Sequence, residues 1–157
     1  MAKDGVRLLA WLQRLFYVLF AMQVVTMFGL MILAYTAGIE DQMPWTVQKI
    51  YLASILISVA LALVFCEFIT WLQKRNARKR RTLRLKLNGM AMAFTLRMAL
   101  INMICIFLLG CTYYYNLRWL LPVYALMGMY YISTFPRAGK LRRAMRLSPK
   151  SAKELGL

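Results

Sequence analysis

Glu67 and Arg97 are the two ionisable side chains that lie deep inside the long apolar runs of this 157-residue sequence. Glu67 comes seven residues before Lys74, and Arg97 eleven residues after Lys86 in a run of opposite direction. In helices that rise 1.5 Å per residue, both side chains would lie about 10–16 Å below the basic segment between them. Because an isolated charge in hydrocarbon costs about 2.5 kcal/mol or more, we expect Glu67 and Arg97 to pair.

This pair has two interpretations. We favour a fixed salt bridge that holds the two helices in register, and the alternative is a functional site that controls the path of an ion or an anionic lipid. Gln23 and Asn102 are further polar residues in the apolar runs and could hydrogen-bond across helices. Asn102 lies about 140° around the helix from Arg97, which argues against a polar conduit through one protomer.

Catalytic chemistry finds little support in the remaining residues. The sequence has no His, which excludes imidazole-based zinc, haem and nucleophilic sites. Cys66, Cys105 and Cys111 lie in apolar runs without C-x-x-C spacing and are expected to be buried apolar residues. We therefore expect no enzyme, no cofactor, no catalytic residue and no metal site.

The composition is that of a membrane protein. Hydrophobic residues make up 62% of the chain, against about 45–50% in soluble domains. Four apolar runs are long enough, or nearly so, for the roughly 20 residues that a helix needs to cross the hydrocarbon layer. The predicted spans are 15–37, 50–73, 87–112 and 119–135. The first is longer than the apolar segment of a signal peptide, so we retain it as a span.

These spans predict an all-α integral membrane protein. Its four transmembrane helices would form two antiparallel hairpins within one domain, residues 1–136, followed by a basic tail, residues 137–157. Eighteen of the 21 Lys and Arg residues fall at the N-terminus, in the loop 74–86 and in the tail. Basic residues resist translocation, so both termini and this loop are predicted to be cytoplasmic. We expect the bacterial cytoplasmic (inner) membrane.

The loop and the tail carry more positive charge than topology alone requires. Anionic lipid headgroups are the first candidate partner. An acidic protein would answer to the same charge, nucleic acid is a less favoured candidate, and a topological anchor alone is the remaining alternative. The candidate binding residues are Arg78, Lys79, Arg80, Arg81, Arg84, Lys86, Arg142, Arg143 and Arg146.

Two shorter patterns concern packing. The basic and apolar residues of 138–147 alternate as in a short basic amphipathic helix that lies on the membrane surface. Small residues recur along the second span (Ser54, Ser58, Ala62, Cys66) and the third (Ala91, Thr95, Ala99). Such stripes allow close approach of helices in lipid, so we expect these two spans to pack together.

The sequence therefore favours a small non-enzymatic membrane protein that forms a homo-oligomer or joins a larger complex as an accessory subunit. Its basic cytoplasmic face would bind anionic lipid or an acidic partner. The alternative is a channel or transporter for an ion or an anionic lipid, with a path between protomers and the Glu67/Arg97 pair beside it.

Overall fold

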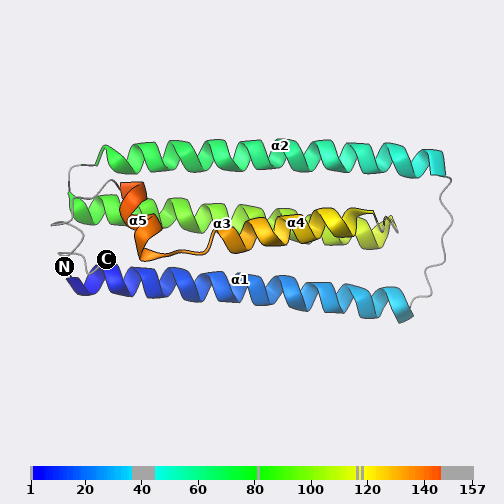
Figure 1. Ribbon diagram of the computed structural model, residues 1–157, viewed down its shortest axis with the longest axis horizontal. Coiled ribbons are helices and arrows are strands. Elements are labelled where there is room, and N and C mark those ends of the chain that lie inside the picture. Colours follow the sequence, from blue (N-terminus) through cyan, green and yellow to red (C-terminus); the bar gives the residue numbers. More distant parts are fainter. Residues whose placement is uncertain (1, 37–44, 81, 116, 118, 146–157) are drawn as a thin grey trace.

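The computed structural model describes residues 2–36, 45–80, 82–115, 117 and 119–145. It contains five helices: α1 (Ala2–Thr36), α2 (Trp45–Arg78), α3 (Leu83–Tyr114), α4 (Leu120–Ser133) and α5 (Ala138–Met145), shown in Figure 1. No strand occurs among these residues, so the predicted all-α class is confirmed.

Three of the helices are long and apolar enough to cross a membrane, which suggests a membrane protein. They contain 35, 34 and 32 residues, and at 1.5 Å per residue each is about 48–52 Å long. The hydrocarbon layer is about 30 Å thick. The fourth predicted span corresponds to α4, which has 14 residues and is therefore about 21 Å long.

The basic segment 74–86 was predicted as a loop, and this is wrong for most of its length. Helix α2 continues to Arg78 and α3 begins at Leu83, so only a short connection separates them. Lys, Arg, Leu and Ala are good helix formers, which explains why both helices continue into the basic segment. Thr82 caps α3, since its hydroxyl oxygen accepts a hydrogen bond of 3.4 Å from the Leu85 backbone amide.

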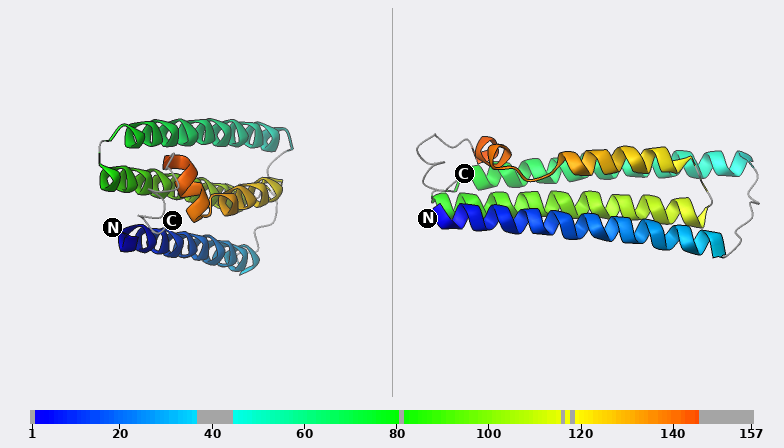
Figure 2. Two further views of the ribbon diagram at one scale, coloured as in Figure 1. Left: turned by 60° about the vertical axis from the view of Figure 1, so that its left-hand side comes forward. Right: turned by 60° about the horizontal axis from the view of Figure 1, so that its bottom comes forward.

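Helix α3 is the centre of the molecule. It contacts α1, α2, α4 and α5, and α1 and α2 lie on either side of it (Figure 1). Two further views show the long helices running side by side along one axis (Figure 2). Met98, Ile101 and Leu108 of α3 are fully buried. By contrast, Val25 of α1 is 70% exposed and Val64 of α2 is 69% exposed, as expected of side chains that face lipid.

One end of the bundle collects the basic segments. The start of α1, the connection between α2 and α3, and α5 all lie there (Figure 1), and we call it the basic end. Helix α4 is held beside α1 by Tyr131, whose ring stacks on Phe16 at 4.7 Å and whose hydroxyl donates to the Phe16 carbonyl at 3.2 Å. The amide of Gln13 donates to the Pro136 carbonyl at 3.2 Å. These contacts fix the segment that leads into α5.

Helix α5 is amphipathic, as predicted. The prediction that it lies on the membrane surface is wrong for its apolar side, which packs against the bundle. Leu141 and Met145 are buried in the common core, and α5 contacts α2 and α3. Its basic residues Arg142 and Arg143 are exposed. An apolar stripe of this length gains as much from a protein groove as from lipid, and here the bundle supplies the groove.

The two small-residue stripes behave differently from one another. Helices α2 and α3 do pack together, and Cys66 of α2 is buried in the core. Ser54 and Ser58 of the same stripe are exposed. The stripe of α3, made of Ala91, Thr95 and Ala99, lines an open groove whose other wall is Trp11 of α1. The two spans thus pack together as predicted, but the α3 stripe lines the groove beside α1.

Helices α2 and α3 approach each other closely at Gly89, near the basic end. A Cβ atom added to Gly89 would meet the Cβ of Ala77 at 2.8 Å and its Cα at 3.3 Å. The Cα belongs to the backbone of α2 and the Cβ is bonded directly to it. Neither atom can move away as the end of a long, flexible side chain could. Only a glycine at position 89 allows the two helices this separation.

We predict that Gly89→Ala lowers the stability of the protein by about 1–3 kcal/mol, the usual cost of overpacking a tight contact. Thermal unfolding in detergent would measure it. Gly110→Ala and Gly128→Ala are matched controls, because nothing lies within 4 Å of the added carbon, and each should be neutral or stabilising by up to about 1 kcal/mol. Ala77→Gly should rescue Gly89→Ala. Equal stability of the Gly89 and Gly110 variants would contradict the prediction.

Candidate functional site

The structure brings Glu67 of α2 and Arg97 of α3 together. The Arg97 guanidinium lies 2.7 Å from Glu67 Oε1, and its Nε donates to the same oxygen at 2.8 Å. Tyr130 of α4 completes the group: its hydroxyl donates to Glu67 Oε1 and accepts from Arg97 at 2.8 Å. The guanidinium also lies 5.5 Å from the centre of the Tyr130 ring. Three helices therefore meet at one polar cluster, Glu67, Arg97 and Tyr130.

The cluster is open on one side. The Arg97 side chain is 19% exposed and the Glu67 side chain 44% exposed. Glu67 Oε1 takes the contacts with Arg97 and Tyr130, while Oε2 makes no hydrogen bond within the described residues. Charge-assisted hydrogen bonds of this kind are stronger than neutral ones and gain further in a low-dielectric surrounding. The arrangement can hold helices together, and its open oxygen could accept a proton or a cation.

Gln23 and Asn102 do not join this cluster. Gln23 is 1% exposed and Asn102 is 4% exposed, and neither makes a hydrogen bond to Glu67 or Arg97 in the described part of the chain. Three buried polar atoms have no hydrogen-bond partner there: Gln23 Nε2, Asn102 Oδ1 and Thr95 Oγ1. The polar residues of the apolar runs are thus divided among different faces, as the 140° between Arg97 and Asn102 predicts.

Tyr130 was not identified from the sequence as a partner of Glu67 and Arg97. A tyrosine near the end of an apolar run is usual at the membrane interface, where its hydroxyl meets water and headgroups. Nothing in the spacing of a single helix shows that this hydroxyl points inward to Glu67 and Arg97. The signal that could have found it is the missing partner: two charges on two helices leave hydrogen-bonding capacity for a third group.

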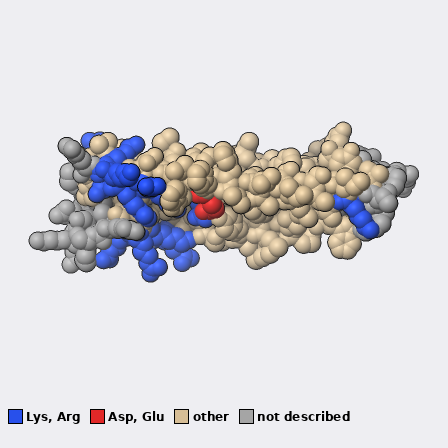
Figure 3. All heavy atoms as spheres, turned by 90° about the horizontal axis from the view of Figure 1, so that it is seen from above, with Lys and Arg blue, Asp and Glu red and all other residues tan. Residues whose placement is uncertain are grey.

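The predicted basic binding residues gather at the basic end. Figure 3 shows most of the Lys and Arg side chains at this end, with few charged side chains along the rest of the bundle. The exposed members on the described residues are Arg78, Lys79, Arg80, Arg84, Arg142 and Arg143, and Lys86 is half-buried. Arg81 and Arg146 lie outside the described residues. The charges of α2, α3 and α5 therefore form one surface, although about sixty residues of sequence separate those of α5 from those of α2 and α3.

Two of the basic residues also hold α5 in place. The Nε of Arg78 donates to the Ala144 carbonyl at 2.8 Å, which ties the end of α2 to α5. The ammonium of Lys140 donates to the Ser133 carbonyl at the end of α4. Partial burial, followed by the positive charges of Arg137 and Arg97, lowers the pKa of Lys140. Arg78 thus has a structural role in addition to the charge for which it was selected.

Similarity to known proteins does not define a class for this chain. No protein-family model, curated protein or solved structure matches it. The described residues define an all-helical protein with three helices long and apolar enough to cross a membrane. Its two distinctive sites are the polar cluster and the basic end.

We predict that Glu67→Gln destabilises the helix packing by about 1–3 kcal/mol. The loss should be smaller than the roughly 3–5 kcal/mol of a stranded charge in a soluble core, because Arg97 can extend toward headgroups. Tyr130→Phe removes only the hydroxyl and should cost about 1 kcal/mol. The charge swap Glu67→Arg with Arg97→Glu should recover much of the loss if the pair is structural.

A double-mutant cycle on thermal stability in detergent checks this prediction, since coupled residues give non-additive effects. Additive losses for Glu67 and Arg97 would mean that the ion pair contributes nothing. If the charge swap restores stability but transport or partner binding is lost, the pair is a functional site. If the swap restores stability and function together, the pair is structural.

Proposed function

We propose that this protein is a non-enzymatic, polytopic membrane protein that works as an oligomer or as an accessory subunit of a larger membrane complex. Its basic cytoplasmic face would bind anionic lipid headgroups or an acidic partner, in a membrane such as the bacterial inner membrane. The observation that carries the proposal is the concentration of positive charge at one end of an apolar bundle (Figure 3). Each basic residue near an anionic membrane surface contributes about 1 kcal/mol.

The charge is poorly neutralised within the protein itself. The formal net charge of the chain is +16, and Glu67, the one acidic side chain among those described, pairs with Arg97. An acidic surface is what such a face attracts, and a cytoplasmic leaflet rich in anionic lipid provides one.

We further propose four membrane crossings, with both termini cytoplasmic. The helices would form two antiparallel hairpins in chain order, α1 with α2 and α3 with α4, although α3 lies between α1 and α2. Helix α3 ends at Tyr114, at the end opposite to α5 (Figure 1). The hydrogen bond from Arg78 to Ala144 holds α5 beside the end of α2. The described chain between Tyr114 and Ala138 therefore returns along α3 toward the basic end. A helix of about 21 Å could serve as the fourth crossing where the membrane thins or flanking residues extend it.

The second candidate function is a channel or transporter for an ion or an anionic lipid. The open Oε2 of Glu67, within a long apolar surface, favours it. Intramembrane carboxylates commonly mark proton and ion paths. Because Gln23 and Asn102 lie apart from the polar cluster, such a path would run between protomers and not through one protomer.

Cysteine labelling tests the proposed topology, in which both termini are cytoplasmic. In a variant whose Cys66, Cys105 and Cys111 are replaced by Ala, a cysteine at position 42 should react with a membrane-impermeant maleimide on intact cells, because the segment between α1 and α2 is external. A cysteine at position 143, on α5, is the matched control and should react only after lysis. Labelling of position 42 only after lysis would overturn the topology.

We predict that replacing Arg78, Lys79, Arg80 and Arg81 with Gln reduces the number of anionic lipids that stay bound to the purified protein. Native mass spectrometry with phosphatidylglycerol and phosphatidylcholine would count them. At about 1 kcal/mol for each of the four charges, the expected loss of affinity is up to about a thousandfold. Added salt should produce the same change in the parent protein, since exposed charges are screened.

Arg78→Gln alone is the control for detachment of α5, because Arg78 binds the Ala144 carbonyl. If the single variant equals the quadruple one, the effect reports α5 and not surface charge. An unchanged lipid count in the quadruple variant would reduce this basic segment to a topological anchor.

A further inference from the structure

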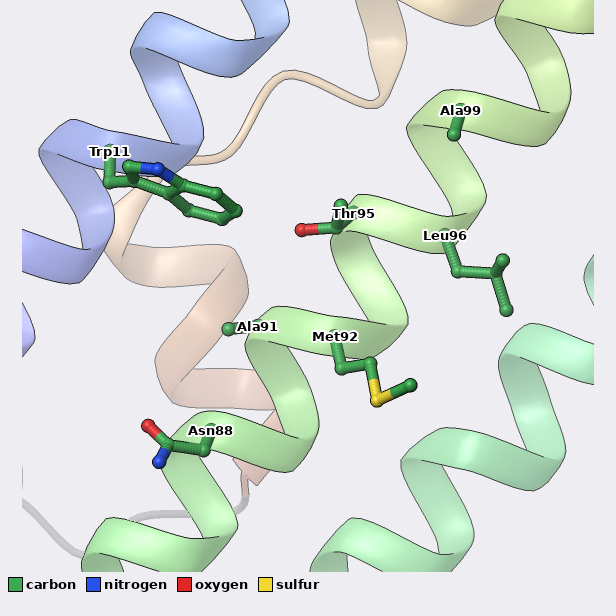
Figure 4. Close-up of a pocket in the computed structure, with 7 residues that line it drawn as sticks. All are labelled: Trp11, Asn88, Ala91, Met92, Thr95, Leu96 and Ala99. Carbon is green, nitrogen blue, oxygen red and sulfur yellow. The ribbon is translucent and has the colours of Figure 1, made fainter.

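Two hollows on the surface of α3 adjoin at Asn88. The first, of about 300 Å³, lies at the basic end and is lined by Arg7 and Leu8 of α1 with Arg84, Leu87 and Asn88 of α3. The second, of about 490 Å³, continues from Asn88 along α3, with Trp11 of α1 on its other side. Figure 4 shows Trp11 reaching across from α1 toward Thr95, with Asn88 and Ala91 on the turns before it. Together they form one groove, the α1/α3 groove.

The polarity of the α1/α3 groove changes along its length. Its mouth carries two guanidinium groups from two helices and one amide. Guanidinium groups bind phosphate with paired, charge-assisted hydrogen bonds, and an amide can add a further donor. Beyond Asn88 the groove is apolar apart from one hydroxyl. The residues that line this part are Trp11, Ala91, Met92, Thr95, Leu96 and Ala99.

The charges of the mouth have no acidic partner among the described side chains. Arg7 and Arg84 are both exposed. Glu67 is the one acidic side chain described, and its carboxylate binds Arg97 and Tyr130. An anion at the mouth would therefore meet two positive charges that no described carboxylate opposes, at the depth proposed for the headgroups.

The dimensions match one leaflet of a membrane. Eleven residues separate Asn88 from Ala99, which is about 16 Å along a helix. Half of a hydrocarbon layer of about 30 Å is about 15 Å. Trp11 is 50% exposed, as is usual for an amphipathic ring near the headgroups. The small side chains of Ala91 and Ala99 leave the room that an acyl chain needs beside α3.

We propose that the α1/α3 groove binds one anionic phospholipid of the cytoplasmic leaflet. Arg7, Arg84 and Asn88 hold the phosphate, and one acyl chain lies along Ala91, Thr95 and Ala99. The inference rests on the proposed function, in which the basic end is cytoplasmic and binds anionic groups. It adds a defined site and a defined ligand class to that general surface.

Charge favours a lipid over a second copy of this chain as the occupant. Small residues on a helix face also suit helix packing in lipid. A second copy, however, carries the same formal net charge of +16 and would bring further positive charge close to Arg7 and Arg84. Like charges at such a rim oppose association, whereas a phosphate neutralises them.

Trp11 provides a reporter inside the α1/α3 groove. In the variant Trp45→Phe, Trp71→Phe, Trp119→Phe, it is the single tryptophan, and bromine on a lipid acyl chain quenches its fluorescence on contact. The protein is reconstituted in phosphatidylcholine vesicles with a small, equal fraction of brominated phosphatidylglycerol or brominated phosphatidylcholine. We expect phosphatidylglycerol to quench at a lower mole fraction, by a factor on the order of ten for two basic residues.

Variants separate the mouth from the rest of the basic end. Arg7→Gln with Arg84→Gln should abolish the preference for phosphatidylglycerol. Arg142→Gln with Arg143→Gln removes the same charge from exposed positions of α5 and should leave the preference intact. Ala99→Phe fills the apolar part and should weaken quenching by both lipids. Native mass spectrometry of the protein with all its tryptophans, in the two arginine pairs, gives a second measurement if the single-tryptophan variant folds poorly.

The outcomes distinguish this site from the general proposal. Equal quenching by the two lipids, or a preference that survives loss of Arg7 and Arg84, would overturn the site. If the same protein loses bound phosphatidylglycerol on substitution of residues 78–81, the general proposal stands while the site fails. Cross-linking between copies through a cysteine at position 99, without lipid preference, would assign the groove to a second copy and would also overturn it.

Discussion

The packing of α3 against every other helix is the constraint on which the rest of the structure depends. Half of its most apolar stretch is buried inside the protein, compared with 11% for α1 and 17% for α2. In lipid, helices gain little from hydrophobic burial against each other, so close packing and interhelical hydrogen bonds must hold them. Helix α3 provides both: Gly89 allows α2 to approach at one level, and Arg97 joins α2 and α4 at another.

The polar cluster links helices that sequence places far apart. Arg97 contacts a carboxylate thirty residues before it and a phenol thirty-three residues after it. A charge that is partly exposed within an apolar surface costs free energy unless it is paired, and here the pairing is shared among three side chains. The same arrangement suits a structural clasp, through the paired Oε1 of Glu67, and a proton-handling site, through its Oε2, which no described group binds.

The sequence predicts the elements of this fold better than their limits. Long apolar runs predict the first three helices, since few other structures satisfy a backbone in lipid. Their ends were wrong near Arg78 and Leu83, because the basic residues between the runs are good helix formers and charge does not stop a helix. The number of membrane crossings stays a prediction, as α4 is shorter than the layer.

Side-chain contacts were likewise predictable from the sequence only in part. The contact between Glu67 and Arg97 could be predicted from opposite sign and similar depth. The role of Tyr130 in this cluster could not be predicted, because the periodicity of a helix does not show where one tyrosine hydroxyl points. Periodicity places Ala91, Thr95 and Ala99 on one face of α3, yet it does not say which neighbour that face meets. The docking of α5 was missed for a related reason, since an amphipathic helix suits protein and lipid equally.

The central position of α3 also sets an order for assembly during synthesis. Within the described residues, α1 and α2 pack chiefly on α3 and only slightly, if at all, on each other. A ribosome completes both helices before it completes α3, at about 5–20 residues per second. In a membrane, the first two helices would therefore remain separate segments for seconds, until Arg97 of α3 supplies the partner of Glu67.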